Sequence, residues 1–156
     1  MSQLTLPLLG HCRCDEVQLR ISAPPILTMA CHCRGCQRMS ASAYSLSVAI
    51  PTEGFEVIRG EPVLGGLRNP DLRHFFCPSC MSWMFTRPPE FRFLPGFVNV
   101  RVTMLDEVSW FSPFIETCAG TKLSWVTMPV VHSYVEFPPV EDYAMLTTEF
   151  ARSLSA

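Results

Sequence analysis

The 156-residue sequence predicts an all-β fold that ends in one short helix. Two observations support this: many short runs in which apolar and polar residues alternate, and fourteen prolines that divide those runs. Alternation with period two places every second side chain on the same face of a strand. Because 48% of the residues are hydrophobic and only 17% are charged, the chain can bury a core without covalent cross-links. We expect a single domain over residues 1–156.

The earliest predicted strands have the most regular alternation. They are residues 17–22 (VQLRIS) and 44–50 (YSLSVAI), and in the second run Leu46, Val48 and Ile50 fall on one face. Later strands are expected at residues 55–60, 72–76, 83–86, 91–94, 97–102 and 130–137.

Helical periodicity is clear only near the end of the chain. Tyr143, Leu146, Phe150 and Leu154 share one helical face, and acidic residues precede them where a first turn favours negative charge. This pattern predicts a helix over about 141–154. A weaker helical turn is expected directly after Cys36, in QRMSAS.

The sequence also limits where the protein is expected to act. We find no export signal at the N-terminus and no apolar window long enough to cross a membrane. We therefore expect a cytoplasmic protein, in which thiols stay reduced and clustered cysteines bind metal more often than they form disulfides. The net charge of -2 provides no basic surface for nucleic acid.

Seven of the eight cysteines form three clusters, and Cys118 stands alone. The clusters are Cys12 and Cys14 in GHCRCDE, Cys31, Cys33 and Cys36 in CHCRGC, and Cys77 and Cys80 in FCPSC. The C-x-C and C-x2-C spacings aim neighbouring sulfurs at one point, as metal sites require. Two closed four-cysteine sites need eight sulfurs, so we expect one site to be a ligand short.

The economical partition joins the two doublets into a closed structural zinc site. Metal bound there contributes directly to folding. The triplet then holds a second zinc and leaves its fourth position for water or substrate, as in catalytic sites. Two other partitions remain open: Cys12 and Cys14 joining two members of the triplet, or Cys118 or a histidine completing the second site as a purely structural one. Iron is also compatible with four thiolates.

Basic residues next to the triplet are candidates for substrate binding. Arg34 and Arg38 could bind a carboxylate through two parallel hydrogen bonds, or could instead balance thiolate charge or lie on the surface. His32 lies between two ligands and is expected to point away from the metal. Cys118 is expected to be a small buried apolar residue.

The order of these motifs resembles one family, the glutathione-dependent formaldehyde-activating enzymes, which also includes centromere protein V. The resemblance runs from about residue 10 to about residue 138. It rests on G-x-C-x-C at Gly10, CHCRGCQR at Cys31, FCPSC at Phe76, PGFVNVRVTMLDE at Pro95 and KLSW at Lys122. This sequence differs from the family pattern at Met81, where glycine is common, and in SPFIETC from Ser112, where a histidine usually follows a proline.

The resemblance implies a zinc-binding β-tent fold of short antiparallel sheets, with two Zn2+ per chain and carbon–sulfur lyase chemistry. In that family the doublets hold a structural zinc, which here would use Cys12, Cys14, Cys77 and Cys80. The triplet holds the catalytic zinc, which would use Cys31, Cys33 and Cys36.

Three functions follow from these expectations. The first is a lyase that joins or cleaves a glutathione-like thiol and a small aldehyde, of the type that makes S-(hydroxymethyl)glutathione. The second is a protein-binding module in which both zincs are structural. The third is a thiol sensor that uses the triplet.

Overall fold

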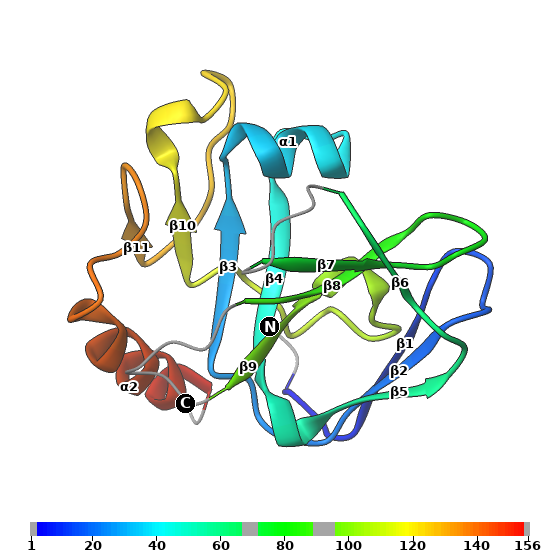
Figure 1. The fold of residues 1–156 in the computed structure, drawn as a ribbon. Helices are drawn as coiled ribbons and strands as arrows, with labels where there is room; N and C mark the ends of the chain where they lie inside the picture. Colours follow the sequence, from blue (N-terminus) through cyan, green and yellow to red (C-terminus); the bar gives the residue numbers. More distant parts are fainter. Residues whose placement is uncertain (1–2, 67–71, 89–95, 155–156) are drawn as a thin grey trace.

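The computed structural model describes residues 3–66, 72–88 and 96–154 (Figure 1). Within these ranges the chain forms eleven strands in two sheets, which confirms the all-β prediction. The smaller sheet has the antiparallel order β1–β2–β5. Its strands are β1 (Leu8–His11), β2 (Gln18–Ile21) and β5 (Phe55–Arg59).

The larger sheet has eight strands in the order β11–β10–β3–β4–β9–β8–β7–β6. Their bounds are β3 (Leu27–Cys31), β4 (Ser45–Pro51), β6 (Val63–Gly65), β7 (Arg73–Phe76), β8 (Trp83–Arg87), β9 (Phe97–Arg101), β10 (Ile115–Thr117) and β11 (His132–Ser133). The expectation of antiparallel pairing fails at one strand, since β10 runs parallel to both β3 and β11. Consecutive strands that pair in parallel need a long crossover, and residues 118–131 between β10 and β11 provide it.

Most predicted strands appear where the alternation places them, at β2, β4, β5, β7, β8 and β9. The long run expected at 130–137 contributes only β11, and the run at 91–94 lies outside the described residues. Four strands were not predicted: β1, β3, β6 and β10. The single domain over 1–156 stays a prediction.

The core encloses β4 on both sides, and Leu46, Val48 and Ile50 pack in one cluster, as predicted. Both faces of this strand are buried, so its side chains do not divide into one inner and one outer set. One face carries Val48 and Ile50 into a cluster with Leu19 and Ile21 of the smaller sheet. The other face carries Ala49 into a second cluster, which includes Leu146 and Phe150 of the C-terminal helix. A strand in the middle of a covered sheet is apolar on both sides.

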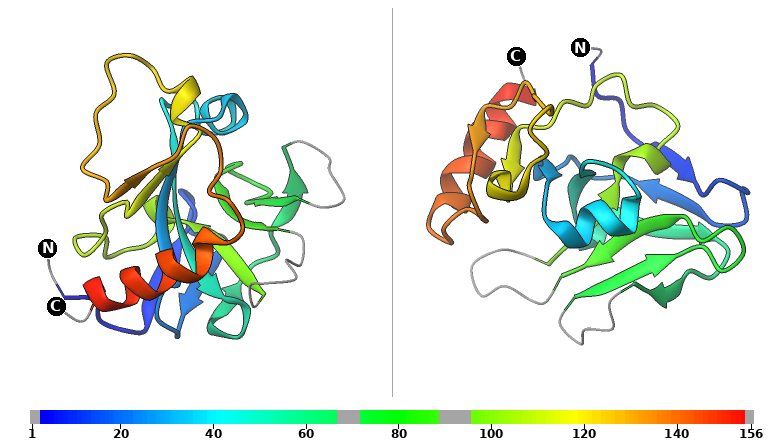
Figure 2. Two further views of the ribbon diagram at one scale, coloured as in Figure 1. Left: turned by 90° about the vertical axis from the view of Figure 1, so that its left-hand side faces the viewer. Right: turned by 90° about the horizontal axis from the view of Figure 1, so that it is seen from above.

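Two helices flank the larger sheet (Figures 1 and 2). The C-terminal helix α2 (Asp142–Leu154) was predicted, and Leu146 and Phe150 are its buried residues. Helix α1 (Arg34–Ser40) lies between the end of β3 and the start of β4, and it starts earlier than the expected turn, inside the cysteine motif. Short 3-10 turns lie at η1 (Thr52–Gly54), η2 (Val102–Met104) and η3 (Ala119–Thr121).

Candidate metal centres

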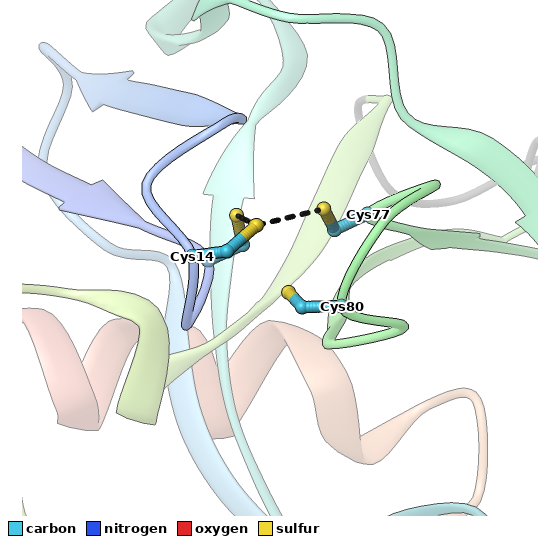
Figure 3. Close-up of side chains that lie close together, drawn as sticks. Cys14, Cys77 and Cys80 are labelled. Carbon is cyan, nitrogen blue, oxygen red and sulfur yellow. Dashed lines mark hydrogen bonds between the residues drawn. The ribbon is translucent and has the colours of Figure 1, made fainter.

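The two cysteine doublets meet in space. Cys12 and Cys14 lie in the loop between β1 and β2, and Cys77 and Cys80 lie in the loop between β7 and β8. Figure 3 shows Cys14 facing Cys77 and Cys80 across the gap between these loops. All four sulfurs lie within 4.8 Å of one another. The structure thus brings together the four residues that the economical partition joined.

The sulfur spacing fits a tetrahedral metal ion. The Cys12 and Cys14 sulfurs are 3.6 Å apart, and the Cys14 and Cys77 sulfurs are 3.7 Å apart. Four sulfurs about 2.3 Å from one zinc would lie about 3.8 Å from each other. A disulfide would need about 2.05 Å. This group is therefore able to hold a metal ion without a change of backbone.

Backbone turns aim these sulfurs. The amide of Cys12 donates to the carbonyl of Val17 at 3.0 Å, and the amide of Val17 donates to the Cys12 sulfur at 3.3 Å. In the other loop the amide of Met81 donates to the carbonyl of Cys77 at 3.1 Å. Met81 has φ of 56°, in the left-handed region that favours glycine. The family's usual glycine at this position therefore has a conformational cause, and Met81 tolerates the same turn.

The triplet forms a second group at the junction of β3 and α1. The sulfurs of Cys31, Cys33 and Cys36 lie within 4.8 Å of one another. Cys31 ends β3, and Cys33 caps α1, where its sulfur accepts a hydrogen bond from the amide of Cys36 at 3.3 Å. Helix α1 thus begins at this point because the second cysteine satisfies one of its free amides.

The thiols of the triplet strongly change one another's pKa values. A hydrogen bond with Cys36 lowers the pKa of Cys31 to about 5, against the effect of burial, and Thr117 acts in the same direction as Cys36. The same contact with Cys31 raises the pKa of Cys36, and burial adds to the rise. Because neighbouring thiolates repel one another, these thiols do not all lose their protons on their own. A cation bound among them would favour the ionised form of all three.

Cys118 lies near this group but is not part of it. Among the described residues, its sulfur does not fall within the 4.8 Å group that the triplet forms. Burial, followed by the charges of Cys31 and Cys33, raises the pKa of Cys118 to about 12. The residue is partly exposed and has φ of 57°, so the expectation of a buried apolar residue is wrong. It forms the start of the η3 turn instead.

A buried polar network supports the triplet from the other face of β3. His32 is completely buried, and its Nε2 lies 2.9 Å from Oε2 of Glu116. Glu116 also accepts hydrogen bonds from Lys122 at 2.9 Å and from Ser133 at 2.8 Å. Burial acts to raise the pKa of Glu116, but the bonds from Lys122 and Ser133 outweigh it and lower the pKa. No pattern in the sequence singles out Glu116, although KLSW contains its Lys122 partner.

Hydrogen bonds also hold the backbone between the ligands. Gln37 donates from Nε2 to the carbonyl of His32 at 2.7 Å and to that of Thr121 at 3.0 Å. The Thr121 hydroxyl donates to the same His32 carbonyl at 2.9 Å. These bonds connect α1, the triplet and η3, so the triplet sits in a fixed frame.

The predicted basic residues lie on the outside of α1. Arg34 and Arg38 are both exposed, and Arg34 donates to the side chain of Gln37 at 2.8 Å. A different arginine was missed by sequence reasoning: Arg101, at the end of β9, is only 7% exposed. Its position in an alternating strand gave no signal of a functional role.

A cavity of about 370 Å3 lies around the start of β4, where Ser45, the β-sheet partner of Cys31, is one of its lining residues. Its walls come from the end of α1, the loop before β8, and η2. The lining includes Met39, Ser45, Met81, Trp83 and Arg101. This volume falls within the range of roughly 300–1,000 Å3 that small-molecule sites occupy. Trp83 thus lines the cavity while remaining largely buried.

The fold and the site define a small β protein with two all-cysteine groups that can bind metal ions. A family model described as "Glutathione-dependent formaldehyde-activating enzyme" matches residues 7–120. This span is most of the chain and contains every cysteine. The chain belongs to the glutathione-dependent formaldehyde-activating enzyme family.

Two individual proteins are similar to this chain. A Penicillium rubens protein, named provisionally as a glutathione-dependent formaldehyde-activating enzyme, is 24% identical over 104 residues, which is 66% of this chain and 54% of that protein. The chain therefore spans about half the length of this relative. A crystal structure of a Rhodobacter sphaeroides protein has a TM-score of 0.50 and 21% identity, covering 65% of this chain and 90% of that one. It supports the similarity of fold.

No helix within the described ranges has the length and apolar character needed to cross a bilayer. The cytoplasmic location stays a prediction.

Proposed function

We propose that this protein is a zinc-dependent carbon–sulfur lyase that joins a glutathione-like thiol to a small aldehyde, or cleaves their adduct. Cys12, Cys14, Cys77 and Cys80 would hold a structural zinc, and Cys31, Cys33 and Cys36 would hold a catalytic one. Family membership supports the reaction class, and the all-sulfur donor sets support zinc.

One observation carries the proposal. The triplet has three converging sulfurs, whereas the other group has four, and Ser45, the β-sheet partner of Cys31, lines a cavity large enough for a small molecule. Zinc bound by three thiolates has a position for one more ligand, and it favours the ionised form of a thiol placed there. The two groups would therefore differ in role because they differ in the number of protein ligands.

The reaction needs no oxidant and no leaving group. The substrate sulfur forms a bond to the aldehyde carbon, the carbonyl π electrons move to the oxygen, and the thiol proton finishes on that oxygen. The chain's part is to hold both molecules in one orientation, which converts a bimolecular encounter into an intramolecular one. The cavity wall limits the approach of the aldehyde, and the frame of Gln37, Thr121 and Glu116 keeps the triplet still.

The roles of Arg34 and Arg38 remain part of this proposal. Both are exposed on α1, the helix that carries Cys36, so they would bind a substrate carboxylate that projects into solvent. An exposed pair contributes little to affinity, roughly 0–1 kcal/mol. Replacing both arginines should therefore raise KM modestly and leave kcat almost unchanged.

The test follows adduct formation by NMR with glutathione and formaldehyde, against the uncatalysed background. Zinc-loaded wild type should form S-(hydroxymethyl)glutathione faster than background, whereas Cys36→Ser should not. Cys118→Ser is the matched control and should keep both the rate and two zincs per chain. A silent wild type, with other thiols and aldehydes also silent, would reject the lyase.

The second candidate is a protein-binding module with two structural zincs. Three large apolar side chains in one segment after β10 favour it: Trp125 is 73% exposed, Val135 74% and Phe137 63%. Exposed apolar groups of this kind are typical of interaction surfaces when they gather in a patch. The same NMR experiment separates the two functions, because a binding module would produce no adduct above background.

A further inference from the structure

Strand register places Arg101 on the same face of the sheet as the triplet. Cys31 lies opposite Ser45 in the β3–β4 pair, and Ser47 lies opposite Arg101 in the β4–β9 pair. Opposite residues share a face, and so do residues two apart on one strand. Cys31, Ser45 and Arg101 therefore lie on one face, at the same end of the larger sheet.

The guanidinium of Arg101 is buried, and the acidic groups whose charges act on it are the thiols of Cys31 and Cys36. No carboxylate pairs with it within the described ranges, and its Nε is buried without a hydrogen-bond partner there. Native proteins rarely leave a buried N–H group unsatisfied, because removing it from water is costly. The ring of Trp83 covers the guanidinium, with its centre 3.9 Å from the Cζ atom.

A β-bulge creates this contact. In the β7–β8 pair Phe75 faces Phe85, but the next pair is Phe76 with Trp83, so the register shifts by one residue. Without the bulge Trp83 and Phe85 would share a face. Instead Phe85 packs in the core between the sheets, while Trp83 covers Arg101 and lines the cavity. Bulges of this kind often re-aim a side chain next to a functional site.

Arg101 remains a cation at neutral pH. Burial lowers the pKa of Arg101 to about 10, and the charges of Cys36 and Cys31 act in the opposite direction. On the same face, the hydroxyl of Ser45 is buried and interacts with the thiol of Cys36, but it has no nitrogen or oxygen partner in the described part of the chain. Arg101 and Ser45 both line the cavity of about 370 Å3. The cavity thus offers a fixed positive charge and a hydroxyl group to a molecule that enters it.

We propose that Arg101 binds a carboxylate of the thiol substrate inside this cavity, with Ser45 as a second hydrogen-bonding group. This inference rests on the proposed function and narrows its substrate class. The enzyme selects small thiols that carry a carboxylate, such as glutathione, over thiols without an anionic group. The apolar walls, which include Met39 and Met81, accommodate the chain between carboxylate and sulfur. Arg101 is then a specificity-determining residue, and the exposed Arg34 and Arg38 act on a different part of the substrate.

Calorimetry with S-methylglutathione tests carboxylate binding by Arg101 directly. The methyl group prevents the sulfur from ionising, so the difference between free acid and ester reports on the carboxylates. The free acid should bind zinc-loaded wild type at least about tenfold more tightly than its dimethyl ester. Arg101→Lys keeps the charge but loses the planar fork, so it should remove most of this preference and leave ester binding nearly unchanged. Arg20→Lys is the matched control, since Arg20 is exposed and paired with Glu56. Equal binding of acid and ester to wild type, or an unchanged preference in Arg101→Lys, would overturn the proposal.

A second measurement needs no variant, in case Arg101→Lys fails to fold. The Arg101 Nε–H resonance of wild type should shift during titration with the acid and stay in place with the ester; no shift with the acid would overturn the proposal. The failures can be separated. If the protein forms the adduct but binds the free acid and the dimethyl ester equally, only the proposed role of Arg101 is rejected. If the protein prefers the free acid through Arg101 but forms no adduct from any thiol, the carboxylate site is supported and the lyase is rejected.

Discussion

Replacing Glu116 by alanine should strongly destabilise the protein. Its carboxylate accepts hydrogen bonds from His32, Lys122 and Ser133, from partners 2.8 to 3.1 Å away. His32 is completely buried, so it cannot replace the lost carboxylate with water. Lys122 is 26% exposed at its side chain and Ser133 is exposed, so both can regain contact with solvent.

The expected cost follows from these differences. Breaking a fully buried ion pair by removing one partner costs about 3–5 kcal/mol. Because two of the three partners can reach water, we expect the low end, about 3 kcal/mol for Glu116→Ala. Glu116→Gln keeps an acceptor and the shape, and should cost about 1–2 kcal/mol through the loss of charge-assisted bonds. For a chain of this length, about 3 kcal/mol corresponds to a fall in Tm of roughly 6–12 °C.

Urea unfolding of the zinc-loaded proteins measures these changes, with Glu61→Ala as the exposed control, expected within about 0.5 kcal/mol of wild type. The pH dependence adds a second check. Since the folded-state pKa of Glu116 is lowered, its stabilisation is complete above the unfolded pKa of about 4.3 and is lost as pH falls through the folded value. The difference in free energy of unfolding between wild type and Glu116→Gln should therefore become smaller in acid. A Glu116→Ala protein within about 0.5 kcal/mol of wild type would refute this reasoning.

Three further predictions concern stability and metal content. Gly10→Ala should lower the free energy of unfolding by about 1–3 kcal/mol and so lower the urea midpoint, because its Cβ would lie 2.4 Å from the carbonyl oxygen of Met104; an unchanged midpoint would mean that β1 and η2 separate freely. Phe150→Ala should cost about 3–5 kcal/mol and speed amide exchange in α2, while Met145→Ala, 49% exposed on the same helix, should change little; equal effects would contradict the packing of α2. Cys77→Ser should bind one zinc per chain and unfold at a lower temperature, whereas two retained zincs would exclude the proposed four-cysteine site.

Alternation in the sequence identified some strands and missed others. It predicted β4, although both faces of that strand are buried, and it missed β1, although burial alternates along it. Residues 17–22 alternate because β2 has one exposed side. β3 is buried almost throughout, so LTMAC shows no alternation and cannot be distinguished from a loop that leads into the cysteine motif. β10 has only three residues, which is too short for any period to appear.

The cysteine groups were predictable because sulfur ligands are few and their spacing is restrictive. Arg101 was not, because an arginine in the alternating run FVNVRV suggests a solvent-facing position. Its burial depends on the eight-stranded sheet, and its contact with Trp83 depends on a bulge in another strand pair. Both are long-range properties that local pattern does not contain.

The central claim is that Cys31, Cys33 and Cys36 hold a metal ion with one position open to a substrate thiol. The visible absorption spectrum of the Co2+-substituted protein during glutathione titration tests it most directly. We predict a saturable change in the thiolate-to-cobalt and ligand-field bands with glutathione, no such change with S-methylglutathione, and none with either compound in Cys36→Ser. A wild-type spectrum that shows two closed four-sulfur sites and does not respond to glutathione would contradict the claim.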